Sequence, residues 1–69
     1  MPLTMAPVGV QSRILKITGR DETRKFLEKL GFIVGSTVTV VSELGGNMIV
    51  NVKDARVAID KAMANRIMI

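Results

Sequence analysis

The spacing of apolar residues along the chain alternates between the periods of strands and helices. Residues 8–18 are rich in β-branched and other apolar side chains and predict a strand. Val8, Val10 and Ile14 share one phase, whereas Leu15 and Ile17 take the other. We therefore expect either a bulge that exchanges the two faces or a strand that is partly covered on both.

Residues 20–30 have a helical period. One face carries the least polar side chains, which are Thr23, Phe26, Leu27 and Leu30, and charged residues cover the rest. Asp21 opens the helix, as the helix dipole favours, and is spaced to pair with Lys25. Gly31 follows at the position of a left-handed C-cap. The pattern predicts an amphipathic helix with Phe26 buried.

Two further runs alternate and are separated by a glycine pair. Residues 36–43 place Val38 and Val40 on one face, and residues 47–53 do the same with an apolar set of Met48, Val50 and Val52. Gly45 and Gly46 between them indicate a hairpin turn. A second tight turn is expected at Asp54 and Ala55, because Asp tolerates unusual backbone angles.

The remaining residues predict three short elements. The first is a strand over residues 56–59 and the last a strand over residues 67–69. Between them we expect a helical turn that Asp60 caps and that ends at residue 65, with Ala62 and Met63 on its apolar side. The fold is therefore mainly β. We expect a small five-stranded barrel, because closure removes exposed strand edges, with one helix after the first strand and a helical turn before the last. Residues 1–7 are treated as a loose segment and residues 8–69 as the domain.

Composition narrows the chemistry. The 69 residues include no Cys, His, Trp or Tyr, so thiol nucleophiles, Ser–His pairs and Cys/His zinc sites are excluded. Divalent transition metals favour imidazole, thiolate and carboxylate ligands, but the carboxylates are scattered, and the adjacent pair Asp21 and Glu22 fits the first turn of a helix. Met48 and Met63 are expected in the core. We predict no enzymatic activity, no cofactor and no metal site.

Ten basic and six acidic residues give a net charge of +4, which suits nucleic acid, an anionic membrane surface or an acidic protein. Nucleic acid is less favoured as a partner than protein, for two reasons. Phe26 and Phe32, the only aromatic residues on which bases could stack, are both expected in the core, and the basic residues are spread from Arg13 to Arg66 instead of forming one patch. The longest mostly apolar stretch, residues 32–41, is about half the length that spans a bilayer. The chain is expected to be cytoplasmic.

Several strings of residues resemble one family. Residues 27–40, LEKLGFIVGSTVTV, resemble the pattern D-L-G-hydrophobic-x-x-G-x-x-V-x-V of the FeoA domain, and the Gly45–Gly46 pair precedes the next strand as it does there. Residues 50–59 resemble its V-x-V-x-G-x-R-hydrophobic-A-hydrophobic pattern, and residues 62–69 its A-x-x-I-x-V ending. The resemblance covers residues 8–69. Asp54 replaces the usual Gly, and Lys29 stands where Asp is frequent.

This resemblance implies an SH3-like barrel and a non-enzymatic accessory of bacterial ferrous iron uptake. Its implied partner is the ferrous iron permease with its cytoplasmic GTPase domain. The protein would then be associated with the membrane only through this permease. The same barrel resembles the C-terminal domain of iron-dependent repressors, so a metal-linked regulatory domain is one alternative. A small basic nucleic-acid-binding barrel is the second, and self-association through an open barrel edge is a third.

Candidate contact residues are those that a small barrel cannot easily bury. Leu44 at the hairpin tip is the first choice and Ile33 after the helix the second, joined by three basic residues of the polar helix face, Arg24, Lys25 and Lys29. The simpler alternative is that Leu44 and Ile33 pack against neighbouring segments and the charges only maintain solubility. A proline-binding groove is excluded because Tyr and Trp are absent. Gly45–Gly46 lacks the spacing of a phosphate loop.

Overall fold

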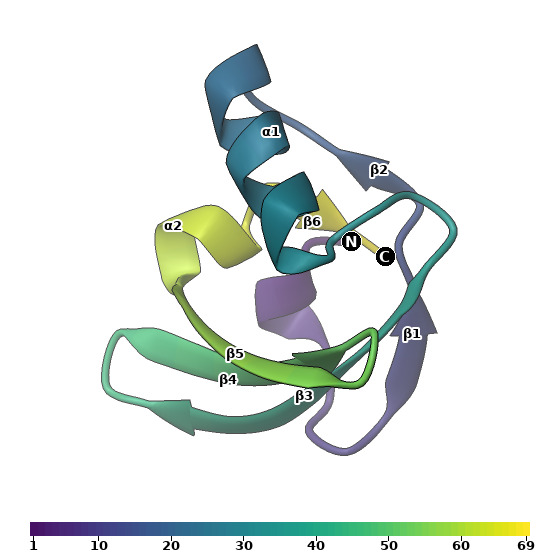
Figure 1. The fold of residues 1–69 in the computed structure, drawn as a ribbon. Helices are drawn as coiled ribbons and strands as arrows, with labels where there is room; N and C mark the ends of the chain where they lie inside the picture. The colour runs from purple at the N-terminus through teal and green to yellow at the C-terminus, as the bar shows by residue number, and fades with distance from the viewer.

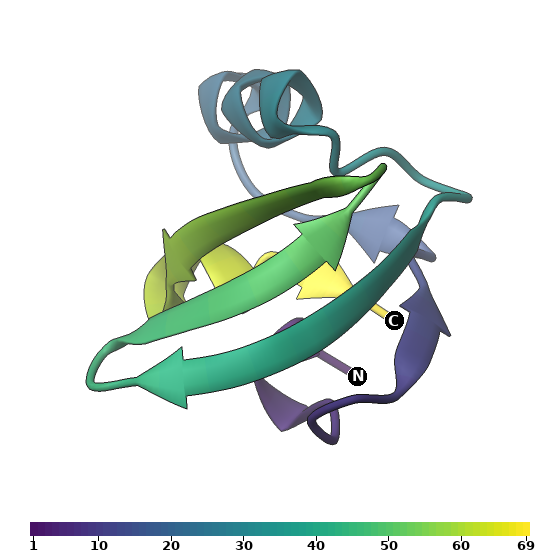
Figure 2. The ribbon, with the colours of Figure 1, turned by 60° about the horizontal axis from the view of Figure 1, so that its bottom comes forward.

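A four-stranded antiparallel sheet carries most of the core. The computed structural model describes residues 1–69, and its larger sheet has the order β1 (Gln11–Arg13), β3 (Thr37–Leu44), β4 (Asn47–Val52) and β5 (Ala55–Asp60) (Figure 1). The alternation predicted for β3 and β4 is confirmed, because the same apolar residues are buried: Val38, Val40, Met48, Val50 and Val52. Figure 2 shows the β3–β4 turn and the β4–β5 turn at opposite ends of this sheet.

A second, two-stranded sheet explains the change of phase in the first segment. β2 (Lys16–Ile17) pairs with β6 (Ile67–Met68), so the single strand predicted over residues 8–18 is wrong. The backbone leaves β3 after Arg13, and the Leu15 N–H donates to the Met68 carbonyl at 2.8 Å. Ile14 and Ile17 are buried on either side of this switch, while Val8 and Val10 are exposed.

The strands do not close into the predicted five-stranded barrel. Six strands form two sheets, and β5 pairs only with β4, which leaves its outer edge open. The first segment joins the two sheets, because β1 pairs with β3 in the larger sheet and β2 pairs with β6 in the smaller one. The mainly β class, the long helix after the first segment and the helical turn before the last strand are as predicted.

The long helix α1 (Asp21–Leu30) ends where predicted, with Gly31 left-handed at φ 106°. Leu27 is buried, but the expectation for Phe26 is wrong, since its side chain is 48% exposed. The part of α1 before Phe26 extends beyond the sheets (Figure 1), and the side of the helix that packs on the core is limited to Leu27 and Leu30. The predicted Asp21–Lys25 pair is replaced by a contact of 3.8 Å between Arg24 and Asp21.

Two local predictions near the C-terminus differ by small shifts. The tight turn lies at Lys53 and Asp54, whose φ angles are 47° and 63°, rather than at Asp54 and Ala55. Helix α2 (Lys61–Ala64) is capped by Asp60 as predicted, but its inner side is Met63 and Ala64, with Ala62 exposed. Because α2 is only about one turn long, few of its side chains can face the core, and these are Met63 and Ala64.

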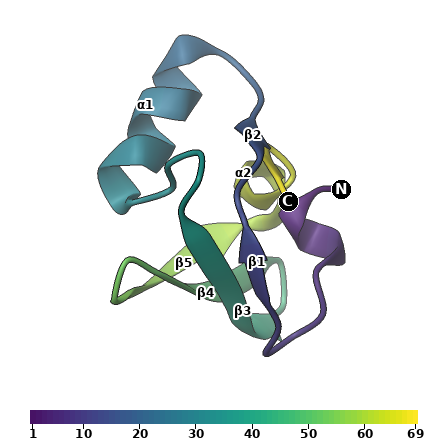
Figure 3. The ribbon, with the colours of Figure 1, turned by 90° about the vertical axis from the view of Figure 1, so that its right-hand side faces the viewer.

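The two chain ends lie side by side (Figure 3). The Met1 ammonium donates to the Ile69 carbonyl at 2.9 Å, and the Ile69 N–H donates to the Met1 carbonyl at 2.7 Å. A 3-10 turn, η1 (Leu3–Met5), follows. Within residues 1–7, which the sequence analysis treats as loose, Leu3 and Ala6 are buried in the core.

Candidate interaction surfaces

The structure separates the two apolar contact residues predicted from the sequence. Leu44 is 74% exposed at the β3–β4 turn, and Ile33 is 40% exposed in the loop before β3. The whole of β3 runs between the two positions, so they lie toward opposite ends of the larger sheet. The three basic candidates, Arg24, Lys25 and Lys29, are exposed on α1, which leads directly into the loop of Ile33.

Ile33 instead joins two exposed residues that the sequence analysis did not select. The loop after α1 is fastened to the β1–β2 junction by the Ile14 N–H to Ser36 carbonyl bond and the Gly35 N–H to Ile14 carbonyl bond, both 2.8 Å. Leu15 and Val34 beside these bonds are 63% and 58% exposed. Leu15, Ile33 and Val34 are here called the apolar corner. The phase change at Leu15 was the only sequence signal for it.

A polar depression lies on the outer face of the larger sheet, near the β4–β5 turn. It measures about 480 Å³, and its lining residues come from all four strands and that turn: Gln11, Thr37, Thr39, Asn51, Val52, Lys53, Asp54 and Arg56. We call it the sheet hollow. Strand register forms it, because Gln11 faces Thr39, Thr39 faces Asn51 and Asn51 faces Arg56.

One hydrogen bond orders a charged side chain of the sheet hollow. The Arg56 Nε–H donates to Asn51 Oδ1 at 3.3 Å, across the β4–β5 pair. The two terminal nitrogens of Arg56 then remain available to a ligand. Only one residue of the lining, Val52, is apolar, so the sheet hollow suits a polar and hydrogen-bonding ligand.

Carboxylates are rare at both surfaces, with one in the sheet hollow and none in the apolar corner. No cluster of three or more His, Cys, Asp or Glu side chains occurs in the structure. Asp54 is the only carboxylate that lines the sheet hollow, so the hollow offers no pair of carboxylates for acid–base chemistry. No helix has the length and apolar character needed to cross a bilayer.

Comparison with known proteins identifies the family. The sequence profile of the FeoA domain matches residues 1–69. A crystal structure of the iron uptake regulatory protein FeoA is 29% identical, with a TM-score of 0.91, and the match covers 99% of this chain and 92% of that one. The FeoA of Stenotrophomonas maltophilia, solved with zinc, is 26% identical with a TM-score of 0.84, covering 99% and 87% of the two chains.

The S. maltophilia protein is described as a prokaryotic SH3-domain protein, which confirms the SH3-like fold expected from the sequence. A manganese-dependent transcriptional repressor shares the fold alone, at 17% identity and a TM-score of 0.87, with 97% of this chain matched to 39% of the repressor. Curated protein sequences give no significant match. With a profile match along its whole length and FeoA proteins among its structural neighbours, the chain belongs to the FeoA family, which is associated with ferrous iron transport.

Proposed function

We propose that this protein is a non-enzymatic, cytosolic accessory of bacterial ferrous iron uptake that docks on the GTPase domain of the iron permease. The observation that carries the proposal is the apolar corner, where three large apolar side chains stay exposed on a small domain. The S. maltophilia relative is described as a candidate activating factor of ferrous iron transport, which supports a transport partner.

The apolar corner and helix α1 would make different contributions to an interface. Leu15, Ile33 and Val34 supply apolar area that a partner can desolvate, and this is the part of an interface that contributes most affinity. The exposed basic residues Arg24, Lys25 and Lys29 of α1 form a rim that steers an acidic partner surface. If the partner conformation that the domain binds best is the active one, binding raises transport by shifting the population toward it.

A titration with the isolated GTPase domain tests this proposal. Isotope-labelled protein is expected to show NMR shifts that concentrate at the apolar corner. Val34→Ser is expected to weaken binding at least fivefold, because it removes buried apolar area from the centre of the contact. Val8→Ser is the matched control, since Val8 is equally exposed at 57% but lies before β1. Leu44→Ser shows whether the hairpin tip also takes part.

The functional half of the proposal needs a second readout. Saturating protein is expected to change GTP turnover or iron transport by the permease, and Val34→Ser to reduce that change. If both rates stay the same at saturation, the domain is not a regulator of the permease. Equal losses of affinity for Val34→Ser and Val8→Ser would assign the contact to another face.

A further inference from the structure

We infer that the sheet hollow is a docking site for an extended acidic segment of a partner protein. The inference stands apart from the proposed function, since the sheet hollow shares no residue with the apolar corner and the partner need not be the permease. It rests on the charges around the sheet hollow, their spacing and the polar side chains between them.

Three basic residues gather at this end of the sheet, two from the β4–β5 segment and one, Arg13, from far earlier in the chain. Arg13 on β1 faces Thr37 of the lining, Arg56 on β5 faces Asn51, and Lys53 lies in the β4–β5 turn. The single ion pair of the molecule joins Arg24 and Asp21 on α1, so none of the three is neutralised within 4.0 Å. An unneutralised positive face attracts an anionic partner.

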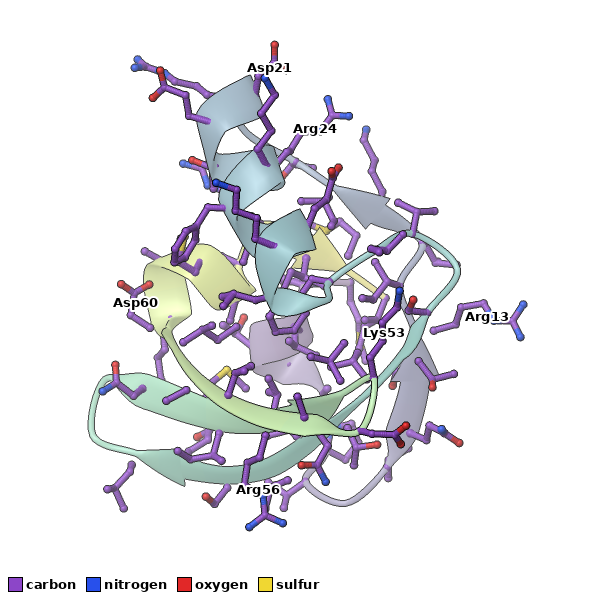
Figure 4. The ribbon with its side chains drawn as sticks, viewed as in Figure 1. Arg13, Asp21, Arg24, Lys53, Arg56 and Asp60 are labelled. Atoms are coloured by element: carbon purple, nitrogen blue, oxygen red, sulfur yellow. The ribbon has the colours of Figure 1, made fainter.

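The arrangement of these cations selects an extended ligand. Arg13 and Arg56 stand on the two outer strands, about 14 Å apart across three strand spacings and offset by two residues along the strands. Figure 4 shows Arg13, Lys53 and Arg56 pointing in different directions, so they do not converge on one small anion. An extended peptide covers that span with about four residues, which lets separate carboxylates reach separate cations.

The side chains between the cations fit a peptide better than a nucleic acid. Gln11 and Asn51 offer amide donors and acceptors, and Thr37 and Thr39 offer hydroxyls, all of which can bond to peptide groups and carboxylates. Single-stranded nucleic acid needs aromatic platforms for its bases, and neither Phe of the chain lines the sheet hollow. Because Arg56 is already held by Asn51, less side-chain entropy is lost when it binds.

One residue of the lining has the wrong charge for an acidic ligand, and replacing it tests the inference. Asp54 is the only acidic residue in the lining, and it would repel a carboxylate. Its φ of 63° is a left-handed conformation that Asn also tolerates, so Asp54→Asn removes the charge without straining the turn. The inference therefore predicts a variant that binds more tightly as well as variants that bind more weakly.

The experiment is an NMR titration of the labelled full chain with a short Glu-rich peptide, and with the same peptide carrying Gln in place of Glu. Shifts are expected around Gln11, Thr39 and Asn51 with the Glu peptide only, and affinity is expected to fall as salt is added. Arg13→Gln and Arg56→Gln are each expected to weaken binding about two- to fivefold, and Asp54→Asn to strengthen it by a similar factor.

Matched variants away from the sheet hollow separate a local effect from a change of net charge. Lys61→Gln removes a positive charge and Glu28→Gln a negative one. Lys61 is exposed on α2, beyond the far end of β5 from the sheet hollow, and Glu28 is exposed on α1. Effects equal to those of Arg56→Gln and Asp54→Asn would overturn the inference. So would an absence of shifts at low salt, or tighter binding of single-stranded RNA or of phosphatidylglycerol vesicles than of the Glu peptide.

Discussion

At the scale of single residues, a carboxylate sets the start of α2. Asp60 Oδ1 accepts the N–H of Met63 at 2.7 Å, so one of the free N–H groups of the first turn is satisfied by the side chain that precedes it. The helix has only four residues, and the cap is a large share of its hydrogen bonding. The buried Ala64 and the start of β6 follow directly, so the cap also positions the last strand.

Replacing this cap gives a stability prediction. Asp60→Ala is expected to lower the free energy of unfolding by about 1 kcal/mol, because the N–H of Met63 loses its partner. Urea denaturation followed by circular dichroism measures the change. Asp60→Asn is the control, since an amide oxygen accepts the same bond and stability should be nearly retained. An equal loss in both variants would assign the effect to charge and not to capping.

At the scale of elements, α1 is held to the body of the protein mainly at its C-terminal end. Leu27 is the one residue of α1 that is fully buried, and Leu30 is partly buried against the core. Gly31 then turns the chain at a place where an added Cβ would lie 3.6 Å from the Val52 side chain of β4 and 3.8 Å from that of Lys53 in the β4–β5 turn. Phe26 sits one residue before Leu27 and yet is about half exposed, so the helix uses a narrower apolar stripe than its sequence offers.

Neighbouring residues on α1 should therefore respond very differently to truncation. Leu27→Ala is expected to cost about 2–4 kcal/mol of unfolding free energy, because it leaves a cavity in the core. Phe26→Ala is expected to cost less than about 1 kcal/mol, since much of the ring is already in water. Thermal or urea unfolding of the pair measures both values. Similar costs would show that Phe26 packs on the core in solution.

The same scale shows what the sequence could and could not predict. The β3–β4 hairpin was predictable because Val38 and Val40 alternate on β3 and Met48, Val50 and Val52 on β4, on either side of Gly45 and Gly46. The bulge between Val40 and Ser42 was not predicted. The break between β1 and β2 appeared only as a phase change at Leu15, because the choice of partner strand depends on the tertiary fold. Phe26 was misplaced because periodicity shows which side of a helix is apolar, but not how much of it is covered.

Neither surface could be located from spacing alone. Arg13, Lys53 and Arg56 read as scattered charges along the chain, and only the register of four strands brings them to one end of the sheet. Leu15 and Val34 are separated by a helix in sequence and come together through two backbone hydrogen bonds at Ile14. Ile33 was selected from the sequence as an apolar residue in the link after the helix, and it is 40% exposed in the structure, while its role in a contact stays a prediction.

At the scale of the whole molecule, the first residues are part of the core. Leu3 is fully buried, and Pro2 forms a bridge with Met68 that extends the small sheet. Thr4 Oγ1 donates to Asn65 Oδ1 at 2.7 Å, which ties η1 to the end of α2. A domain of this size has a total stability of only about 3–10 kcal/mol, so one such buried residue matters to the entire fold.

A matched pair in η1 tests this role. Leu3→Ala is expected to lower the free energy of unfolding by about 2–4 kcal/mol through loss of core volume. Met5→Ala, in the same turn but with an exposed side chain, is expected to change it by less than about 0.5 kcal/mol. Equilibrium unfolding in urea distinguishes the two. If residues 1–7 are loose in solution, both substitutions will be equally mild.

The contact between Met1 and Ile69 makes the backbone almost a closed ring. Ends that already meet can be joined by a short linker at little entropic cost, and the ring can be opened elsewhere. Gly45 and Gly46 are exposed, and a side chain added at either position would meet no other atom within 4 Å. They form the β3–β4 turn, at the opposite end of the sheet from the β4–β5 turn (Figure 2). A circular permutant that starts at Gly46 would keep every strand pair while changing the order in which the strands are synthesised.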